Sequence, residues 1–347
     1  MNPESLTNRD LQIASKIRRV LVTGGGGFLG KAIVKLLRKK AYEVRSFNRR
    51  TYPELEKLHV EQVQGDISNR NAVNQACQGM DLVFHVAAKT GIWGNYRSYF
   101  ATNVIGTQNV IAACRDRGIP YLVHTSSPSV AYNENAVQGA DESLPYPSNY
   151  LTHYQKTKFL AERAVVQASS EALKTIILRP RLIWGPGENQ MIPRIIARAN
   201  RLIQVGDNRN LIDTIYIDNA AEAHMLAAER LQQNHALSGN IYFISQDQPI
   251  YCWEMINRIL AAAGKSPVKR SIPAGLAYAL GAVMEIIFYI MRLSGEPQMT
   301  RFLARELSQS HYFDIKAAKK DLGYLPRVSI DEGFERLKLW LESEPQQ

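Results

Sequence analysis

The stretch VLVTGGGGFLGKAIVKLL, residues 20–37, places four consecutive glycines between two regular segments. Val20 to Val22 form a short apolar run, which predicts a buried parallel strand. The apolar residues that follow the glycines recur at helical spacing, which predicts a helix over Lys31–Lys40. Bare backbone between a strand and a helix permits a tight turn and a close approach by a ligand.

Three of these glycines have the spacing Gly24-x-x-Gly27-x-x-Gly30. Without side chains there, a pyrophosphate can approach the N terminus of the helix, and the last glycine lets the helix pack closely on the strand. The unpaired amides and the positive end of the helix dipole at that place favour negative charge. A strand, glycines and a helix in this order therefore predict a dinucleotide-binding site.

The next predicted strand, Tyr42–Arg50, ends in Asn48, Arg49 and Arg50. A site that prefers NAD usually has an acidic residue here, about 20 residues beyond the glycines, which binds the ribose 2′-hydroxyl. This chain has no carboxylate at that place, and its two guanidinium groups can bind a 2′-phosphate. We therefore predict NADP(H) as the cofactor, with these three residues in its binding site.

The glycine spacing, with Thr23 before it and Phe28-Leu29 within it, resembles the extended type of the short-chain dehydrogenase/reductase superfamily. The resemblance implies an α/β fold, with a Rossmann doubly wound parallel sheet and a smaller C-terminal substrate lobe. It also implies that Asn103 supports the active site from a helix. Further cofactor contacts are expected from Phe28, Leu29, Asp66, Ala87 and Pro180.

A second group of residues predicts the catalytic site. The fifth predicted strand ends in Ser126-Ser127, and a helical stretch further on carries Tyr154-x-x-x-Lys158. Residues four apart lie on the same face of a helix. The same spacing recurs at Tyr312 and Lys316, but no serine-bearing strand precedes that pair, so we interpret it as chance.

These residue types suit hydride transfer to a ketone, because the ketone oxygen gains negative charge and needs a proton donor. A free tyrosine has a pKa of about 10, and a nearby lysine cation lowers it, so Tyr154 is the predicted general acid and Lys158 its partner. A serine would hydrogen-bond the substrate oxygen, and the superfamily pattern favours Ser127 over Ser126. By the same resemblance, Lys158 also binds the nicotinamide ribose.

The segments HTSSPSVAY and RPRLIWGPG resemble the 3β-hydroxysteroid dehydrogenase-like branch of the superfamily. They are most similar to the bacterial reductases of 2-alkyl-3-oxoalkanoates in long-chain olefin biosynthesis. The resemblance implies NADP(H)-dependent reduction of a 3-keto group on a large, apolar, acidic substrate. The alternatives are a 3β-hydroxysteroid dehydrogenase, with or without isomerase activity, and a sugar-nucleotide epimerase or dehydratase. Trp93 and Trp184 indicate either an apolar pocket or core packing.

The resemblance covers about residues 18–342, and we expect two regions within it. The NADP-binding core should span 18–185, with parts of 210–245 returning to it, and 186–342 should form mainly the substrate lobe. By family resemblance we also expect a homodimer, with residues 103–118 and 153–169 at its interface.

The composition limits the possible partners. Among 347 residues, 42 Lys and Arg stand against 32 Asp and Glu, a formal net charge of +10. No basic block or nucleic-acid motif accounts for it, so we expect no nucleic-acid partner, and either a solvated surface or a preference for anionic ligands. Cys77, Cys114 and Cys252 show no metal or disulfide spacing, which predicts no metal site and a reducing cytoplasm. The first 19 residues lack the apolar stretch of a secretion signal, and a short extra helix is expected there.

Residues 272–293, IPAGLAYALGAVMEIIFYIMRL, form an apolar segment interrupted by Glu285. The length alone allows a membrane span, which the central glutamate opposes. The other interpretations are a helical pair over the substrate pocket, and a surface helix that contacts a membrane or a partner enzyme.

Overall fold

The structure is a computed structural model that describes residues 17–132 and 135–343. The short helix expected near the N terminus therefore lies largely outside the described residues. The central sheet has seven strands in the order β12-β7-β5-β4-β1-β2-β3, and every neighbouring pair is parallel. Its strands are β1 (Arg19–Thr23), β2 (Glu43–Asn48), β3 (Glu61–Gln64), β4 (Leu82–His85), β5 (Tyr121–Thr125), β7 (Lys174–Pro180) and β12 (Ile241–Ile244).

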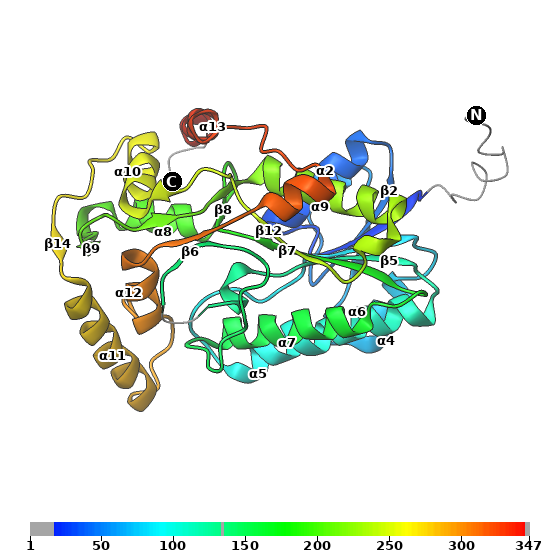
Figure 1. Ribbon diagram of the computed structural model, residues 1–347, viewed down its shortest axis with the longest axis horizontal. Helices are drawn as coiled ribbons and strands as arrows, with labels where there is room; N and C mark the ends of the chain where they lie inside the picture. Colours follow the sequence, from blue (N-terminus) through cyan, green and yellow to red (C-terminus); the bar gives the residue numbers. More distant parts are fainter. Residues whose placement is uncertain (1–16, 133–134, 344–347) are drawn as a thin grey trace, which may run out of the picture.

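Helices cover both faces of this sheet, because the central strands are apolar on both sides (Figure 1). On β1, Val20 and Val22 pack toward one helical layer and Leu21 toward the other. The first layer contains α2 (Phe28–Lys39) and α9 (Ile217–Gln233). The second contains α4 (Arg70–Ala76), α6 (Gly106–Asp116) and α7 (His153–Ala168). This arrangement confirms the predicted doubly wound Rossmann sheet.

The strand order reverses between β1 and β4, which is the place where open parallel sheets bind ligands outside their carboxyl ends. The glycine turn follows β1, the serine pair follows β5, and Arg181 follows β7, so all three reach the same edge. The remaining short elements of this half are α3 (Pro53–Glu56), α5 (Tyr96–Tyr99), the π-helix η1 (Phe100–Ile105), and the 3₁₀ turns η2 (Pro128–Val130) and η4 (His235–Leu237).

The other half is built from small sheets and helices, most of which lie at one end of the molecule (Figure 1). A four-stranded sheet has the order β13-β10-β15-β6, and the pairs β11-β8 and β14-β9 form two smaller sheets. The strands of these three small sheets are β6 (Val137–Ala140), β8 (Ile183–Trp184), β9 (Gln204–Val205), β10 (Leu211–Ile212), β11 (Ile215–Tyr216), β13 (Ile250–Tyr251), β14 (Ser271–Ile272) and β15 (His311–Phe313). The helices of this half are α8 (Met191–Ala197), η3 (Ala199–Arg201), α10 (Cys252–Ala262), α11 (Ala274–Ile290), α12 (Arg301–Ser308), η5 (Ala318–Leu322) and α13 (Ile330–Ser343).

Two ambiguous sequence features are decided by packing. Trp184 is fully buried and its ring meets those of Tyr216 and Phe334, so it belongs to the core and not to an apolar pocket. Most of the apolar segment 272–293 forms one helix, α11, that packs against α12. None of the helices within the described ranges combines the length and the apolar character needed to cross a membrane.

Candidate active site

The turn between β1 and α2 is shaped for a close approach by an anion. Gly24 has φ +72°, and a Cβ there would lie 2.9 Å from the Cα of Ala87. A Cβ on Gly30 would lie 2.1 Å from the carbonyl oxygen of Gly24. The first turn of α2 contains no acidic residue, no described side chain caps it, and its backbone ladder begins with Lys31 N donating to Gly27 O at 2.8 Å. The amides of Gly26 and Gly27 already donate to Asn48 Oδ1 and Gly24 O, so the amides of the first helical turn, residues 28–30, are the ones available to a phosphate.

Buried polar contacts join the glycine turn to the end of β4. The amides of Val86 and Ala87 both donate to Thr23 Oγ1 at 3.2 Å. The ring of His85 lies between Thr23 Oγ1, 2.8 Å from Nδ1, and Thr107 Oγ1, 2.9 Å from Nε2. Burial lowers the pKa of His85 to about 3, helped by the charge of Lys158, so this histidine is neutral and structural.

The end of β2 contributes to the same place. Asn48 Oδ1 accepts a hydrogen bond from Gly26 N at 3.0 Å, so Asn48 holds the glycine turn. Arg49 and Arg50 are exposed, and the guanidinium of Arg50 lies 5.1 Å from the centre of the Tyr52 ring. Both cations are thus available to a ligand at this edge.

Asp66 follows β3, and it is exposed. Its pKa is lowered chiefly by hydrogen bonds from the hydroxyl and the amide of Ser68, so it is ionised at neutral pH. An ionised carboxylate next to the ends of β2 and β3 can accept hydrogen bonds from an adenosine group.

The start of α7 holds the predicted general acid beside the serine loop. Thr152 caps the helix, and its Oγ1 accepts a hydrogen bond from Gln155 N at 3.2 Å. Gln155 Nε2 donates to the carbonyl oxygens of Ser129 at 3.2 Å and Tyr132 at 3.0 Å. These bonds hold the first turn of α7, which carries Tyr154, against the loop after β5.

The structure brings Tyr154 together with Ser127. Burial raises the Tyr154 pKa above its ordinary value, and the nearby Ser127 hydroxyl, which lies 2.9 Å from Ser129 Oγ, and the charge of Arg181 act against that rise. Ser126 is 5% exposed, and its hydroxyl meets no partner within the described part of the chain. The geometry therefore favours Ser127 as the hydroxyl that acts with Tyr154.

Lys158 is placed differently from the expectation that it lowers the Tyr154 pKa. Its Nζ donates to the carbonyl oxygen of Thr125 at 2.6 Å, and burial lowers its own pKa to about 8 while the charge of Glu162 raises it. The cation whose charge acts on Tyr154 is Arg181. Sequence spacing put Tyr154 and Lys158 on one helix face but could not show which atom the ammonium binds.

Asn103 lies in the π-helix η1, an irregular helix type that is frequent at functional sites. Its side chain accepts a hydrogen bond from Lys89 N at 2.7 Å and donates to Thr157 Oγ1 at 3.0 Å. It thereby joins the loop after β4 to α7, next to Lys158. This contact agrees with the supporting role that the family resemblance implies.

Arg181 is the site residue that sequence reasoning missed. Its Nη1 donates to the hydroxyl of Tyr132 at 2.7 Å, and its Nη2 donates to Glu306 Oε2 at 2.7 Å. The available signal was a second arginine directly after Arg179-Pro180, in an otherwise apolar strand end. Glu306 offered no signal, since it lies in α12, 125 residues further along the chain.

A second buried ion pair supports the helix that carries the site. Arg179 Nε and Nη2 donate to the two carboxylate oxygens of Glu162 at 3.0 and 2.6 Å, and the side chains are 1% and 0% exposed. The hydroxyl of Tyr146 donates to the same carboxylate at 2.8 Å. Glu162 lies one helical turn beyond Lys158, which explains its effect on the lysine.

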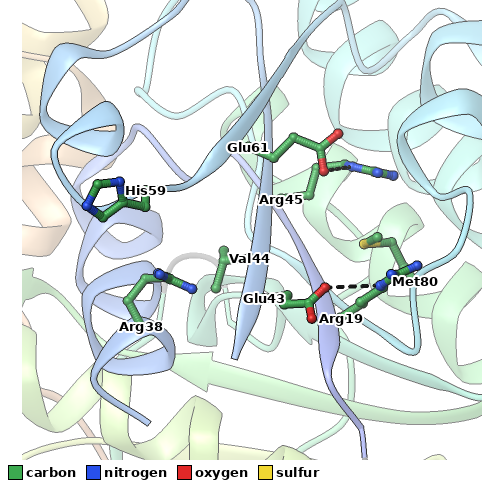
Figure 2. A pocket seen from close by; sticks show the side chains of 8 residues that line it. All are labelled: Arg19, Arg38, Glu43, Val44, Arg45, His59, Glu61 and Met80. Atoms are coloured by element: carbon green, nitrogen blue, oxygen red, sulfur yellow. Dashed lines mark hydrogen bonds and ion pairs between the residues drawn. The ribbon is translucent and has the colours of Figure 1, made fainter. Parts of the chain in front are cut away.

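A surface hollow of about 360 Å³ lies elsewhere (Figure 2). Arg19, Glu43 and Glu61, which line it, begin β1, β2 and β3, so it opens at the amino edge of the sheet. Two ion pairs, Arg19 with Glu43 and Arg45 with Glu61, compensate four of its five Arg and Glu charges, and Arg38 is the fifth. Because ligands of parallel sheets bind at the carboxyl edge, this hollow is not the cofactor site.

Residues 21–273 match the sequence model of the 3-beta hydroxysteroid dehydrogenase/isomerase family. The chain belongs to this family. It is 48% identical over 325 residues to the 2-alkyl-3-oxoalkanoate reductase of Stenotrophomonas maltophilia, covering 92% of this chain and 98% of the relative. The sterol-4-alpha-carboxylate 3-dehydrogenase, decarboxylating, of Mus musculus is 33% identical, with 93% and 90% covered.

These comparisons confirm the resemblance seen in the sequence, and relatives that are reductases and dehydrogenases support oxidoreductase activity. Among solved structures, gox2253 superposes with a TM-score of 0.76 at 26% identity, covering 93% of this chain and 97% of that one. The fold is thus shared along nearly the whole chain. Neither the family nor the fold distinguishes NADP from NAD.

Proposed function

We propose that this chain is an NADP(H)-dependent reductase that converts a 2-alkyl-3-oxoalkanoate into the 2-alkyl-3-hydroxyalkanoate. The observation that carries the proposal is that Ser127, just after β5, and Tyr154, at the start of α7, lie near each other, so that the serine hydroxyl acts on the Tyr154 pKa at the carboxyl edge of the sheet where the glycine turn also lies. The 48% identity to a reductase of that substrate supports the substrate class.

The residues present fit a nicotinamide dinucleotide. The cradle between Gly24 and Ala87 is one that a Cβ would fill, and the first turn of α2 follows it with no side-chain cap. Lys158 would hold the nicotinamide ribose, by family resemblance, and Pro180 lies at the end of β7 beside that region. When bound, the reduced cofactor supplies the hydride.

The chain's own residues manage the charge that develops on the substrate oxygen. The Ser127 hydroxyl donates a hydrogen bond to that oxygen, and Tyr154 Oη gives it a proton. Because burial raises the Tyr154 pKa, the phenol keeps its proton at neutral pH, which is the form that a general acid needs. The guanidinium of Arg181 then stabilises the phenolate that remains.

Replacing Ser127 by Ala is expected to lower kcat about ten- to a hundred-fold, the range of one hydrogen bond to a group that becomes charged. Ser126→Ala is the matched control and should keep its activity, because its buried hydroxyl meets no described partner. Steady-state kinetics of both variants checks this. A larger loss in S126A would exchange the two roles.

Replacing Glu162 by Gln is expected to shift the alkaline limb of kcat/KM to lower pH. Burial lowers the pKa of Lys158 and the charge of Glu162 raises it, and the combined result is a pKa of about 8. Without that negative charge the pKa falls, so the ammonium, and with it the activity, is lost at a lower pH. The pH profile is compared with that of E335Q, a change at an exposed position. An alkaline limb that stays in place would show that it does not report Lys158.

The cofactor choice is tested at the end of β2. In R49Q/R50Q, the Kd of NADPH should rise about ten- to a hundred-fold, because charge-assisted hydrogen bonds to the 2′-phosphate are lost. The Kd of NADH should change little. R209Q, which removes an exposed arginine from the other half, is the control. Wild-type protein that binds NADH more tightly than NADPH would contradict the assignment.

A second candidate is oxidation of a sterol acid. The 33% identical mouse relative is a sterol-4-alpha-carboxylate 3-dehydrogenase, and its name, like that of the alkanoate reductase, describes a carboxylate on the carbon next to the reacting one. The same catalytic residues would serve both substrates.

The deciding experiment follows nicotinamide absorbance with purified protein and NADP⁺. One arm contains a long-chain 2-alkyl-3-hydroxy acid, and parallel arms contain a 3β-hydroxysteroid and its 4-carboxylate. Turnover of the alkanoic acid alone supports the proposal. Turnover of a steroid alone would replace it with the second candidate.

A further inference from the structure

Helix α11 presents an unusual apolar surface to solvent. Among the described residues, nine of the thirteen large hydrophobic side chains that are exposed lie between residues 276 and 293. They include Ile286, 57% exposed, and Ile290, 71% exposed. The set is Leu276, Leu280, Val283, Ile286, Ile287, Tyr289, Ile290, Met291 and Leu293. Six of them, Leu276, Leu280, Val283, Ile286, Ile287 and Ile290, recur at helical spacing and form one stripe along α11. A contiguous patch of this kind marks an interaction site.

The opposite side of α11 is fixed against α12, which sets the orientation of the stripe. A Cβ on Gly281 would lie 2.6 Å from the backbone of Thr300, so the two helices meet closely. Glu285, the one acidic residue of α11, accepts hydrogen bonds from Arg301 N at 2.8 Å and Arg301 Nε at 2.7 Å. The guanidinium of Arg305 lies 4.6 Å from the centre of the Tyr278 ring. The acid of the helix is therefore bound at α12, and the stripe itself carries none.

Cations lie at both ends of this stripe. Lys269 and Arg270 precede α11 and Arg292 follows it, and all three are exposed. Within the described ranges, none of them takes part in an ion pair. An apolar stripe bounded by free cations is complementary to an anionic bilayer surface, where apolar side chains enter the acyl boundary and cations meet the headgroups.

We propose that α11 lies flat in the surface of an anionic lipid bilayer and anchors the protein there. A second copy of the chain fits this surface less well. In a two-fold symmetric contact through α11, an antiparallel arrangement would bring Arg292 next to Lys269 and Arg270 of the partner, and a parallel one would pair each cation with its own copy. Either arrangement sets like charges against each other, which costs binding free energy.

The position of α11 connects this surface to the site. The Phe288 ring meets the Trp93 ring edge-on at 6.3 Å, and the carbonyl oxygen of Trp93 accepts a hydrogen bond from the hydroxyl of Tyr99 at 3.0 Å. Through α12, the same unit supplies Glu306 to Arg181. A docked α11 would therefore bring the catalytic edge near the bilayer, where a two-tailed acid is dissolved. This last step rests on the proposed function, whereas membrane contact does not.

The test is flotation of the purified full chain with vesicles, in the absence of substrate. Vesicles of phosphatidylethanolamine and phosphatidylglycerol should carry the protein, while pure phosphatidylcholine vesicles should bind it at least ten-fold more weakly. Binding should fall as salt is added. In K269Q/R270Q/R292Q, affinity should fall about five-fold for each cation removed, as expected for charges near an anionic surface.

The apolar contribution is tested with matched variants. I286S/I290S should bind anionic vesicles at least ten-fold more weakly than wild type. L325S/L339S removes two equally exposed leucines outside α11 and should bind like wild type. Equal binding by both variants would overturn the proposal. The proposal would also be overturned if the wild-type protein binds none of the vesicles and is a dimer that becomes monomeric in I286S/I290S. In that case α11 would be an interface between copies.

Measurements of turnover separate the proposed membrane contact from the proposed reductase function. I286S/I290S should reduce a short, water-soluble 2-alkyl-3-oxo acid at the wild-type rate and be slower only on a long-chain acid held in vesicles. Equal rates on the vesicle-held acid would remove the delivery role. If wild type binds anionic vesicles but reduces neither acid, the proposed function fails and the membrane contact stands.

Discussion

Replacing Tyr154 by Phe is expected to lower kcat about 10²- to 10⁴-fold, the usual contribution of a positioned general acid. In the proposed mechanism the phenol, beside Ser127, is the proton donor, and phenylalanine keeps the ring without the proton. NADPH should bind with unchanged affinity, because the glycine turn and Lys158 are untouched. Steady-state kinetics and fluorescence titration of NADPH measure the two effects.

The chain contains its own control for this experiment. Tyr312 precedes Lys316 with the same spacing as Tyr154 and Lys158. Tyr312 lies in strand β15, and Lys316 pairs on the surface with Asp314 at 2.8 Å, so this pair has no place at the site. Y312F should keep full activity. Full turnover by Y154F would remove the catalytic assignment.

Replacing Arg179 by Met is expected to lower the free energy of unfolding by about 3–5 kcal/mol, because it leaves the buried carboxylate of Glu162 without its cation. Both side chains are almost completely inaccessible to water, so solvent cannot compensate for the lost guanidinium. Urea denaturation followed by circular dichroism measures the change. R19M, which breaks an exposed ion pair with Glu43, is the control and should cost little.

The double variant R179M/E162M distinguishes a lost ion pair from a packing defect. Replacing both partners of a buried pair by apolar residues is often neutral. The double variant should therefore recover most of the stability that R179M loses. If it remains as unstable as R179M, the loss comes from packing around Tyr146 and Phe243, whose rings contact the guanidinium.

Local sequence was sufficient for the glycine turn. A strand that is apolar on both faces, a run without side chains and a helical repeat follow one another within 18 residues, and each dictates its own backbone. The order of the serine strand and the Tyr154 helix was sufficient to predict the edge of the sheet at which both lie, because parallel strands bring their carboxyl ends to one edge. The same local reading left α11 open between three interpretations, since an apolar helix can face a core, a bilayer or a partner.

Tertiary packing alone decided the electrostatics of the site. Arg181 and Glu306 are separated by 125 residues and meet only because α12 packs beside the loop after β7. The Lys158 ammonium, on α7, meets the carbonyl oxygen of Thr125 at the end of β5, and the charge of Arg181 acts on Tyr154. Burial raises or lowers the pKa of each group according to neighbours from distant elements, and no local pattern in the sequence records which neighbours those are.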